Sequence, residues 1–145
     1  MKIKRITAED TNALYNLGLQ QFKGEFWYTK KFLKDSIKNS EFRFGAFEGK
    51  KMLGGILVQQ SDKPKLWIYF FIVDKKHRRE GIGGKLLKSV EKIRIKGFDM
   101  LFVDFEPTDI LAKNFYTKYG FKKSAKIKNW FGPHTYALLY AKKFF

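Results

Sequence analysis

The pattern of apolar and polar positions divides the chain into segments of strand period and helix period. Apolar and polar side chains alternate over 2–7 and 41–48, whereas 66–73 is apolar throughout and predicts a central strand covered on both faces. Recurrence of apolar residues every three or four positions predicts helices between the strands. The predicted elements are, in order, a strand at 2–7, helices at 8–21 and 30–39, strands at 41–48, 52–60 and 66–73, a helix from 82 to 97, a strand at 101–105, a helix at 110–119, and a hairpin of 121–130 and 136–142.

Capping residues mark the ends of the predicted helices. Thr29 and Asp109 stand where a side-chain oxygen can cap the first turn, and Gly97 and Gly120 stand where a helix can end. The sequence therefore predicts where three of the helices start or stop.

Two helices carry an apolar row that is predicted to face the sheet. The first row is Ile82, Leu86, Val90 and Ile93, with Leu87 beside it, and the second is Leu111, Phe115 and Tyr119. Within the strand at 52–60, the pair Gly54-Gly55 indicates a bulge or a close approach of another segment to the backbone.

A short basic segment containing glycines joins the apolar strand to the helix that follows it. A helix N-terminus carries unpaired amide donors and about half a positive charge, so it attracts anions such as phosphate. Gly81 and Gly83 allow a ligand to come close to the backbone, and the guanidinium groups of Arg78 and Arg79 suit phosphate oxygens. The segment is therefore a candidate phosphate site.

Two well-known phosphate loops are excluded by residue identity. A nucleotide P-loop needs glycine five positions before Gly84 and a hydroxyl residue after Lys85, but Arg79 and Leu86 occupy those positions. A dinucleotide-binding loop needs a third glycine where Leu86 stands.

The remaining pattern is Arg78-x-x-Gly81-x-Gly83 between a strand and a helix. It resembles the acetyl-CoA loop of the GNAT superfamily of N-acetyltransferases. One departure is Lys75, which stands where many members have proline.

A second segment supports the same resemblance. Residues 109–121 are similar to the later GNAT motif, Asn-x-x-Ala-x-x-x-Tyr-x-x-x-Gly-Phe, with Asp109 in place of the asparagine. The two motifs stand in the family's order and at its usual separation, and together they cover residues 66–121.

The resemblance implies a fold and an activity. The fold would be a single α/β domain over residues 1–145, a mixed, twisted sheet in the order βααβββαβαββ with helices on both faces. The activity would be transfer of an acetyl group from acetyl-CoA to a primary amine by direct attack, without a metal. The acceptor would be a protein N-terminus, a lysine or a small amine, and many members are homodimers.

The resemblance also implies roles for individual residues. Backbone amides of the loop would hold the cofactor pyrophosphate. Free backbone groups of Ile72 and Val73 would pair with the pantetheine arm, with one amide polarising the thioester carbonyl. Tyr116 would protonate the departing thiolate. The implied cofactor-binding residues are Ile72, Val73, Arg78, Arg79, Gly81, Ile82, Gly83, Gly84, Asp109 and Tyr116.

The general base and the acceptor site stay open. The strand at 66–73 contains no carboxylate, so Asp104, Glu106, His134 and a water chain all remain candidates for the base. Aromatic residues near the first helical connector and the last hairpin would wall the acceptor groove. They are Trp27, Tyr28, Trp130, Phe131 and Tyr136.

Composition narrows the alternatives. The 145 residues include 44% apolar residues, no cysteine and two histidines, which predicts one globular domain without disulfides, thiolate catalysis or a metal site. The chain has no apolar run of about 20 residues and no apolar leader after Met1, so we expect a cytoplasmic protein without membrane attachment.

The formal net charge of +16 allows two interpretations. It could serve solubility and attract the anionic cofactor, or it could bind an acidic partner such as nucleic acid or a ribosomal surface. Two other functions therefore stand beside the enzyme: a catalytically silent acyl-CoA-binding regulatory domain, and a basic module that associates with nucleic acid or ribosomes.

Overall fold

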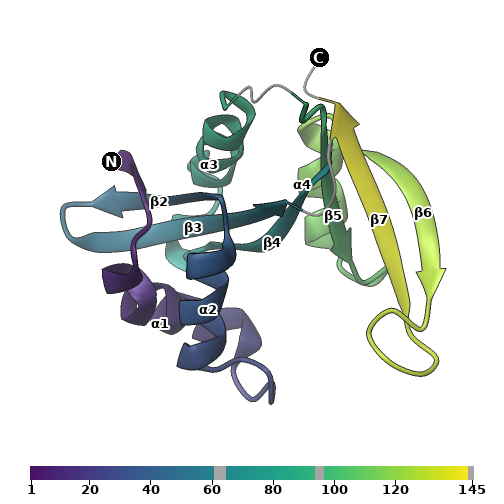
Figure 1. Ribbon diagram of the computed structural model, residues 1–145, viewed down its shortest axis with the longest axis horizontal. Helices are drawn as coiled ribbons and strands as arrows, with labels where there is room; N and C mark the ends of the chain where they lie inside the picture. The colour runs from purple at the N-terminus through teal and green to yellow at the C-terminus, as the bar shows by residue number, and fades with distance from the viewer. Residues whose placement is uncertain (61–64, 94–96, 144–145) are drawn as a thin grey trace. The chain divides into compact units, whose positions relative to one another are not determined.

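The computed structural model describes residues 1–60, 65–93 and 97–143. Within these residues, seven strands form an open, mostly antiparallel sheet accompanied by helices (Figure 1). The elements are β1 (Lys2–Arg5), the 3-10 helix η1 (Ala8–Asp10), α1 (Thr11–Phe22), α2 (Lys30–Asn39), β2 (Phe42–Glu48), β3 (Lys51–Gln60), β4 (Lys65–Val73), the 3-10 helix η2 (Lys75–His77), α3 (Ile82–Glu91), β5 (Met100–Phe105), α4 (Ile110–Lys118), β6 (Lys122–Lys128) and β7 (Tyr136–Lys143). The predicted order βααβββαβαββ is confirmed.

The hydrogen-bonded order of the strands is β1-β2-β3-β4-β5-β7-β6. Adjacent strands run antiparallel in the pairs β1–β2, β2–β3, β5–β7 and β6–β7, whereas β4 and β5 are parallel. In the described residues, the β4–β5 ladder joins the first three residues of β4 to Met100, Leu101 and Phe102.

The chain forms two compact units, and β4 contributes to both. The first unit is Met1–Gln60 with Tyr69–Arg94, and the second is Ser61–Ile68 with Ile95–Phe145. The single domain expected over the whole chain stays a prediction.

In the first unit, helices cover both faces of the sheet. Figure 1 shows α1 and α2 on one face of β2 and β3, and α3 on the other. Two adjacent glycines of β3 explain how close the helices come. A Cβ at Gly54 would lie 3.3 Å from Ile82 Cγ2 of α3, and a Cβ at Gly55 would lie 2.8 Å from Leu14 Cδ1 of α1. The close approach predicted from the glycine pair is confirmed.

A bulge lies beside the same glycines. In the β2–β3 register, Ala46 pairs with Gly54 and Phe47 pairs with Met52, so Leu53 is the extra residue. Both alternatives that the glycine pair left open, a bulge and a close approach, are therefore present in β3.

The second unit packs α4 against β5 and β7. The ring of Tyr116 stacks on Phe105 at 5.7 Å between centroids, and Phe105 contacts Tyr140 at 4.9 Å. Phe121, just after α4, meets the Tyr116 ring edge-on at 5.2 Å. These four aromatic residues are buried and pack together in this unit.

The predicted core row of α4 is wrong. Leu111 is 72% exposed, whereas Tyr116 is only 7% exposed and is the buried residue of the helix. Phe115 and Tyr119 are half-buried. One residue corresponds to a rotation of about 100° in an α-helix, so the buried stripe is centred one residue away from the row that apolar spacing indicated.

Two further expectations are corrected. Helix α3 ends at Glu91 rather than at Gly97, because Ile93 N donates to Val90 O at 3.1 Å and closes the last turn with a shorter-range bond. Residues 94–96, which the predicted helix included, lie outside the described residues. Strand β4 is not covered on both faces, since Tyr69 is 48% exposed while the alternate residues are buried.

Replacement of Gly18 by alanine is expected to destabilise the first unit. Gly18 lies inside α1, and a Cβ there would stand 2.0 Å from Tyr28 Oη. Tyr28 cannot withdraw easily because its hydroxyl donates to Tyr15 O at 2.7 Å and its ring stacks on Phe70. We expect Gly18→Ala to lower the free energy of unfolding by about 1–3 kcal/mol, despite the better helix propensity of alanine.

Urea unfolding measures this difference. Asn16→Ala, at an exposed position of the same helix, is the matched control and should be neutral or slightly stabilising. A Gly18→Ala variant as stable as the parent chain would contradict the packing described for Tyr28.

Candidate functional site

The candidate loop connects β4 to α3 within the first unit. Asp74 follows β4 directly and caps the 3-10 helix η2, and residues 78–81 lead to α3. Arg79 and Gly81 both adopt the left-handed conformation, with φ of 69° and 79°. Glycine adopts it freely, whereas arginine does so at a cost of about 1–2 kcal/mol. The backbone here is held in a specific turn.

The N-terminus of α3 has no side-chain cap. Gly81 is the N-cap residue and therefore offers no side-chain acceptor, while Lys85 N donates to Gly81 O at 3.1 Å to begin the helix. The amides of Ile82, Gly83 and Gly84 are those that a helix leaves without an internal acceptor. The first turn also contains no acidic residue. This helix end can therefore receive an anionic ligand.

The side chains around this helix end are mostly cationic. Arg78, Arg79 and Lys85 are exposed, and neither arginine has a hydrogen-bond or ion-pair partner within the part of the chain that the structure describes. The one acidic residue of the turn, Glu80, pairs with His77 Nδ1 at 3.1 Å. Free guanidinium groups next to a helix N-terminus favour a phosphate ligand.

The loop is fastened to α1 by a contact that the sequence did not indicate. Gln20 Nε2 donates to Asp74 Oδ1 at 3.2 Å, and Lys75 N donates to Gln20 Oε1 at 3.0 Å. Asp74 also accepts from Lys76 N at 3.1 Å, and its own amide donates to Leu53 O at 2.8 Å. The aspartate directly after a strand was a local signal for the turn, but nothing in the sequence indicated Gln20 as its partner.

Neutralising Asp74 is expected to loosen this attachment. Burial disfavours its carboxylate, but the hydrogen bonds from Lys76 and Gln20, with the charges of His77 and Lys51, outweigh burial and lower the pKa of Asp74 below its usual value. The carboxylate therefore stabilises the fold above about pH 4, the unfolded pKa, and this contribution is lost as pH falls through the lower folded pKa.

We expect Asp74→Asn to reduce the free energy of unfolding by about 1 kcal/mol at neutral pH, with a difference that shrinks toward pH 3. Unfolding at several pH values measures it, and Asp35→Asn, which removes an exposed carboxylate, is the control. A deficit that is constant across the pH range would show that the ionised carboxylate is not responsible.

The side chains of two other predicted cofactor residues serve the core or the strand. Ile72 is 2% exposed and belongs to the core cluster of the first unit, and Val73 is half-buried at the end of β4. Their predicted contribution was limited to backbone groups. That backbone role stays a prediction.

In the second unit, Asp109 and Tyr116 lie on α4. Asp109 Oδ1 accepts from Ala112 N at 3.0 Å, so the predicted cap is confirmed. Burial is the main cause that raises the pKa of Tyr116, and the charges of Asp109 and Asp104 raise it further. The phenol therefore stays protonated at neutral pH and retains its hydrogen-bond donor.

The three candidates for the general base lie in different settings of the second unit. Asp104 Oδ2 accepts from Trp130 Nε1 at 3.0 Å, and burial raises its pKa while the indole lowers it in part. Glu106 and His134 are exposed. The carboxylate of Asp104 contacts the predicted site residue Trp130, whereas Glu106 contacts Asp109 only through its backbone oxygen, at 2.9 Å from Asp109 N.

The two aromatic candidates of the first connector, Trp27 and Tyr28, pack against neighbouring aromatic rings of the first unit. Tyr28 is 5% exposed, and its ring stacks on Tyr15 at 5.0 Å. Trp27 is half-buried and packs against Phe22 and Phe32, each at 5.2 Å. Tyr28 is therefore a core residue, and a contact of either residue with an acceptor stays a prediction.

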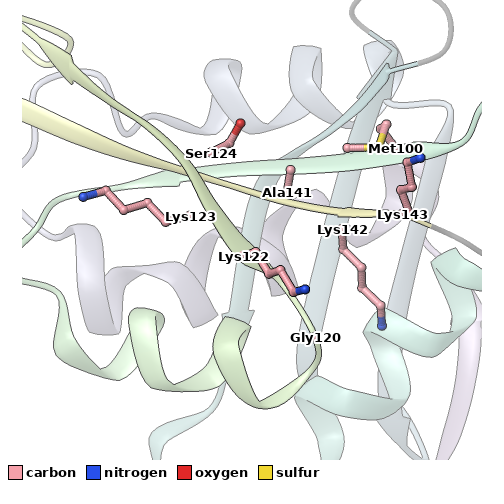
Figure 2. A pocket seen from close by; sticks show the side chains of 8 residues that line it. All are labelled: Met100, Gly120, Lys122, Lys123, Ser124, Ala141, Lys142 and Lys143. Atoms are coloured by element: carbon pink, nitrogen blue, oxygen red, sulfur yellow. The ribbon is translucent and has the colours of Figure 1, made fainter.

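A basic hollow of about 440 Å³ lies in the second unit (Figure 2). Its lining residues are Met100, Gly120, Lys122, Lys123, Ser124, Ala141, Lys142 and Lys143, and it is called the lysine hollow below. Figure 2 shows the side chains of Lys122 and Lys142 extending toward Gly120, at the end of α4. The excess of lysine is evident in the sequence, whereas its concentration on β6 and β7 appears only in the structure.

Among the described residues, no helix is both long and apolar enough to cross a lipid bilayer. Within the same ranges, no group of three or more His, Cys, Asp or Glu is arranged to hold a metal ion.

A family model described as "Acetyltransferase (GNAT) family" matches residues 8–121. The chain is similar to the solved structure of the ribosomal-protein-S18-alanine N-acetyltransferase from Escherichia coli, with 20% identity, a TM-score of 0.80, and coverage of 99% of this chain and 93% of that chain. It is similar to the aminoglycoside 6'-N-acetyltransferase from Enterococcus faecium, with 16% identity, a TM-score of 0.81, and coverage of 100% and 98%.

A third similar structure is the PaiA N-acetyltransferase from Thermoplasma acidophilum in complex with coenzyme A. Identity is 20%, the TM-score is 0.81, and 98% of each chain is covered. No curated protein matches the chain. At these identities the structural matches establish the fold.

Proposed function

The chain belongs to the GNAT family of acetyltransferases, and we propose that it transfers an acetyl group from acetyl-CoA to a primary amine by direct attack. The family predicted from the two sequence motifs is thereby confirmed. The identity of the acceptor, the residues of the site and a cytoplasmic location belong to the proposal and not to the family assignment.

One observation supports the cofactor site above all others. The N-terminus of α3 presents the amides of Ile82, Gly83 and Gly84 without a side-chain cap, next to two exposed arginines. A diphosphate carries the charge and the acceptor oxygens that this arrangement lacks. The residues of the loop therefore fit the pyrophosphate of coenzyme A.

The proposed reaction balances without a covalent enzyme intermediate. The amine nitrogen forms a bond to the acetyl carbonyl carbon while the bond from that carbon to sulfur breaks. The amine loses one proton and the departing sulfur gains one. No cysteine is present to act as a nucleophile. Acetyl-CoA supplies the activated acetyl group, and the protein binds and orients the reactants and handles the proton.

Tyr116 is proposed to donate a hydrogen bond to the departing sulfur. Its phenol remains neutral because burial raises its pKa, so the donor is present whenever the thiolate forms. Each nomination for the base that receives the amine proton, among Asp104, Glu106 and His134, stays a prediction.

A screen of amines with detection of released thiol tests the proposal. Acetyl-CoA is supplied with peptides that have a free N-terminal alanine, with lysine peptides, with an aminoglycoside and with simple alkylamines. Thiol release that depends on one acceptor class supports acetyl transfer. A protein that is stabilised by coenzyme A but releases no thiol with any amine would instead be the silent acyl-CoA-binding domain.

The lysine hollow favours an acidic partner as a second candidate function. Four of its eight lining residues are lysines, on a chain of net charge +16. Phosphates of a nucleic acid would pair favourably with the amines gathered on β6 and β7.

Binding of a short labelled single-stranded RNA tests this second function. We expect affinity to fall steeply between about 50 and 200 mM salt, and Lys122→Gln with Lys142→Gln to reduce the slope of log affinity against log salt by about 1.4. Lys34→Gln with Lys38→Gln, two exposed positions of α2, removes the same charge elsewhere. Equal slopes for the two double variants would mean that the hollow is not the binding site.

A further inference from the structure

Asp104 lies on the face of β5 that is opposite to α4. Side chains alternate along a strand, and Phe105 on one face stacks on Tyr116 of α4. Asp104 and Phe102 therefore share the other face, where Phe102 is paired in register with Trp67 of β4. The carboxylate stands two residues beyond this last pair of the β4–β5 ladder in the described residues.

Three aromatic rings accompany the carboxylate. Trp130 Nε1 donates to Asp104 Oδ2 at 3.0 Å. The Trp130 ring stacks on Trp67 with centroids 6.5 Å apart and planes 20° apart, and Trp67 lies 5.5 Å from Phe102. Trp130 is 45% exposed, so this group of residues is open to solvent.

Hydrogen bonds within the segment that carries Trp130 hold it in a defined turn. Asn129 N donates to Thr135 O at 2.7 Å, His134 N donates to Asn129 Oδ1 at 3.0 Å, and Phe131 N donates to Thr135 Oγ1 at 3.0 Å. Asn129 and His134 both adopt left-handed conformations, with φ of 60° and 62°. Backbone conformations of this kind cluster at binding sites, where surrounding bonds hold them.

The charge of Asp104 lacks a protein counter-ion. The chain contains 30 lysines and arginines, yet within the described residues no ion pair involves Asp104. A carboxylate offers about four acceptor positions, and two neutral donors, the indole of Trp130 and the residue's own amide, reach the Asp104 carboxylate. Burial is the main cause that raises the pKa of Asp104, and hydrogen bonds from the Trp130 indole and from its own amide lower it in part; a nearby cation would lower it further.

Resting on the proposed function, we propose that Asp104, Trp130 and Trp67 form a binding site for a positively charged ammonium group of the acceptor. A carboxylate gives the ammonium a charge-assisted hydrogen bond, and indole faces attract cations. The same site contributes little binding free energy for a neutral molecule of equal size. A purely structural role, in which Asp104 only fastens the hairpin connection, requires no ligand and predicts no preference for charge.

The test uses the whole protein and does not depend on catalysis. The indole N–H resonance of Trp130, assigned with Trp130→Phe, is followed by NMR while n-hexylammonium chloride or 1-hexanol is added. We expect n-hexylammonium to shift this resonance with a dissociation constant on the order of 1–10 mM, as befits a fragment-sized ligand, and 1-hexanol to shift it at least tenfold more weakly. Asp104→Asn, which keeps the shape of the side chain, should weaken n-hexylammonium binding about tenfold.

Glu41→Gln removes an exposed carboxylate from the first unit and should leave n-hexylammonium binding unchanged. Equal affinity of the two ligands for the parent chain, or equal affinity of Asp104→Asn and the parent chain for n-hexylammonium, would overturn the cation site. The comparison of ligands needs no variant, so it stands even where Asp104→Asn fails to fold. Acetyl transfer without any effect of Asp104→Asn rejects this site alone, whereas ammonium binding without thiol release rejects the proposed function alone.

Discussion

Loss of coenzyme A binding is the expected result of replacing Arg78 by alanine and Gly83 by aspartate together. The first change removes a guanidinium that can form charge-assisted bonds with phosphate. The second places a negative charge on the first turn of α3, where the uncapped amides lie. Each change should cost more than about 1.4 kcal/mol of binding free energy, so affinity should fall at least about 100-fold.

Thermal stabilisation measures this effect directly. At a coenzyme concentration of about 100 times the dissociation constant, the parent chain should gain about 2.7 kcal/mol, and the double variant about 0.4 kcal/mol at the same concentration. The melting temperature of the parent chain should therefore rise by roughly 5–11 °C and that of the variant by very little.

Two further variants serve as controls for this experiment. Lys88→Glu changes the net charge by the same amount at the other end of α3 and should keep most of the stabilisation. Gly83 is buried, so Arg78→Ala with Arg79→Asn provides a variant that leaves the helix intact; asparagine accepts the left-handed conformation of residue 79. Undiminished stabilisation in both double variants would remove the loop as the phosphate site.

A large loss of turnover is expected for Tyr116→Phe. The substitution removes only the hydroxyl, so the stacking on Phe105 and the edge contact with Phe121 are kept. If the hydroxyl assists the departing sulfur, kcat should fall by about 100-fold or more, because positioned proton donors contribute about 10²–10⁴. The dissociation constant for acetyl-CoA should stay within about twofold of the parent value, since the donor acts mainly after binding.

Single-turnover assays with the acceptor found by the amine screen provide the measurement. Tyr140→Phe is the matched control, because Tyr140 is also buried in the second unit and also contacts Phe105. It should retain its activity. Full activity of Tyr116→Phe, or an equal loss in both variants, would remove Tyr116 as the proton donor.

Local sequence signals predicted the elements and the loop well. The caps at Thr29 and Asp109, the turn at Gly120 and the hairpin of β6 and β7 depend on neighbouring residues, and the structure confirms each of them. The strand and helix around the candidate loop also follow from local periodicity. The phosphate role of the loop rests on motif resemblance, and its direct test is the binding experiment above.

Features that depend on contacts distant in the sequence were missed or misjudged. Gln20 and Asp74 are 54 residues apart, and nothing in either local sequence indicates their contact. Asp104 and Trp130 are 26 residues apart, so their hydrogen bond could not be read from strand alternation. The burial of Tyr116 was misjudged because apolar spacing alone does not fix the rotation of a helix about its axis.

The adjacent glycines of β3 have a consequence for redesign. Gly54 and Gly55 leave β3 without a side chain at one position on each face, which allows α3 and α1 to lie close to the strand from opposite sides. The two helices also hold the candidate loop between β4 and α3, since α3 follows it and α1 supplies Gln20. Any larger residue at these two positions would push one helix outward and separate the two segments that hold the loop. Redesign of the site should therefore leave both glycines unchanged.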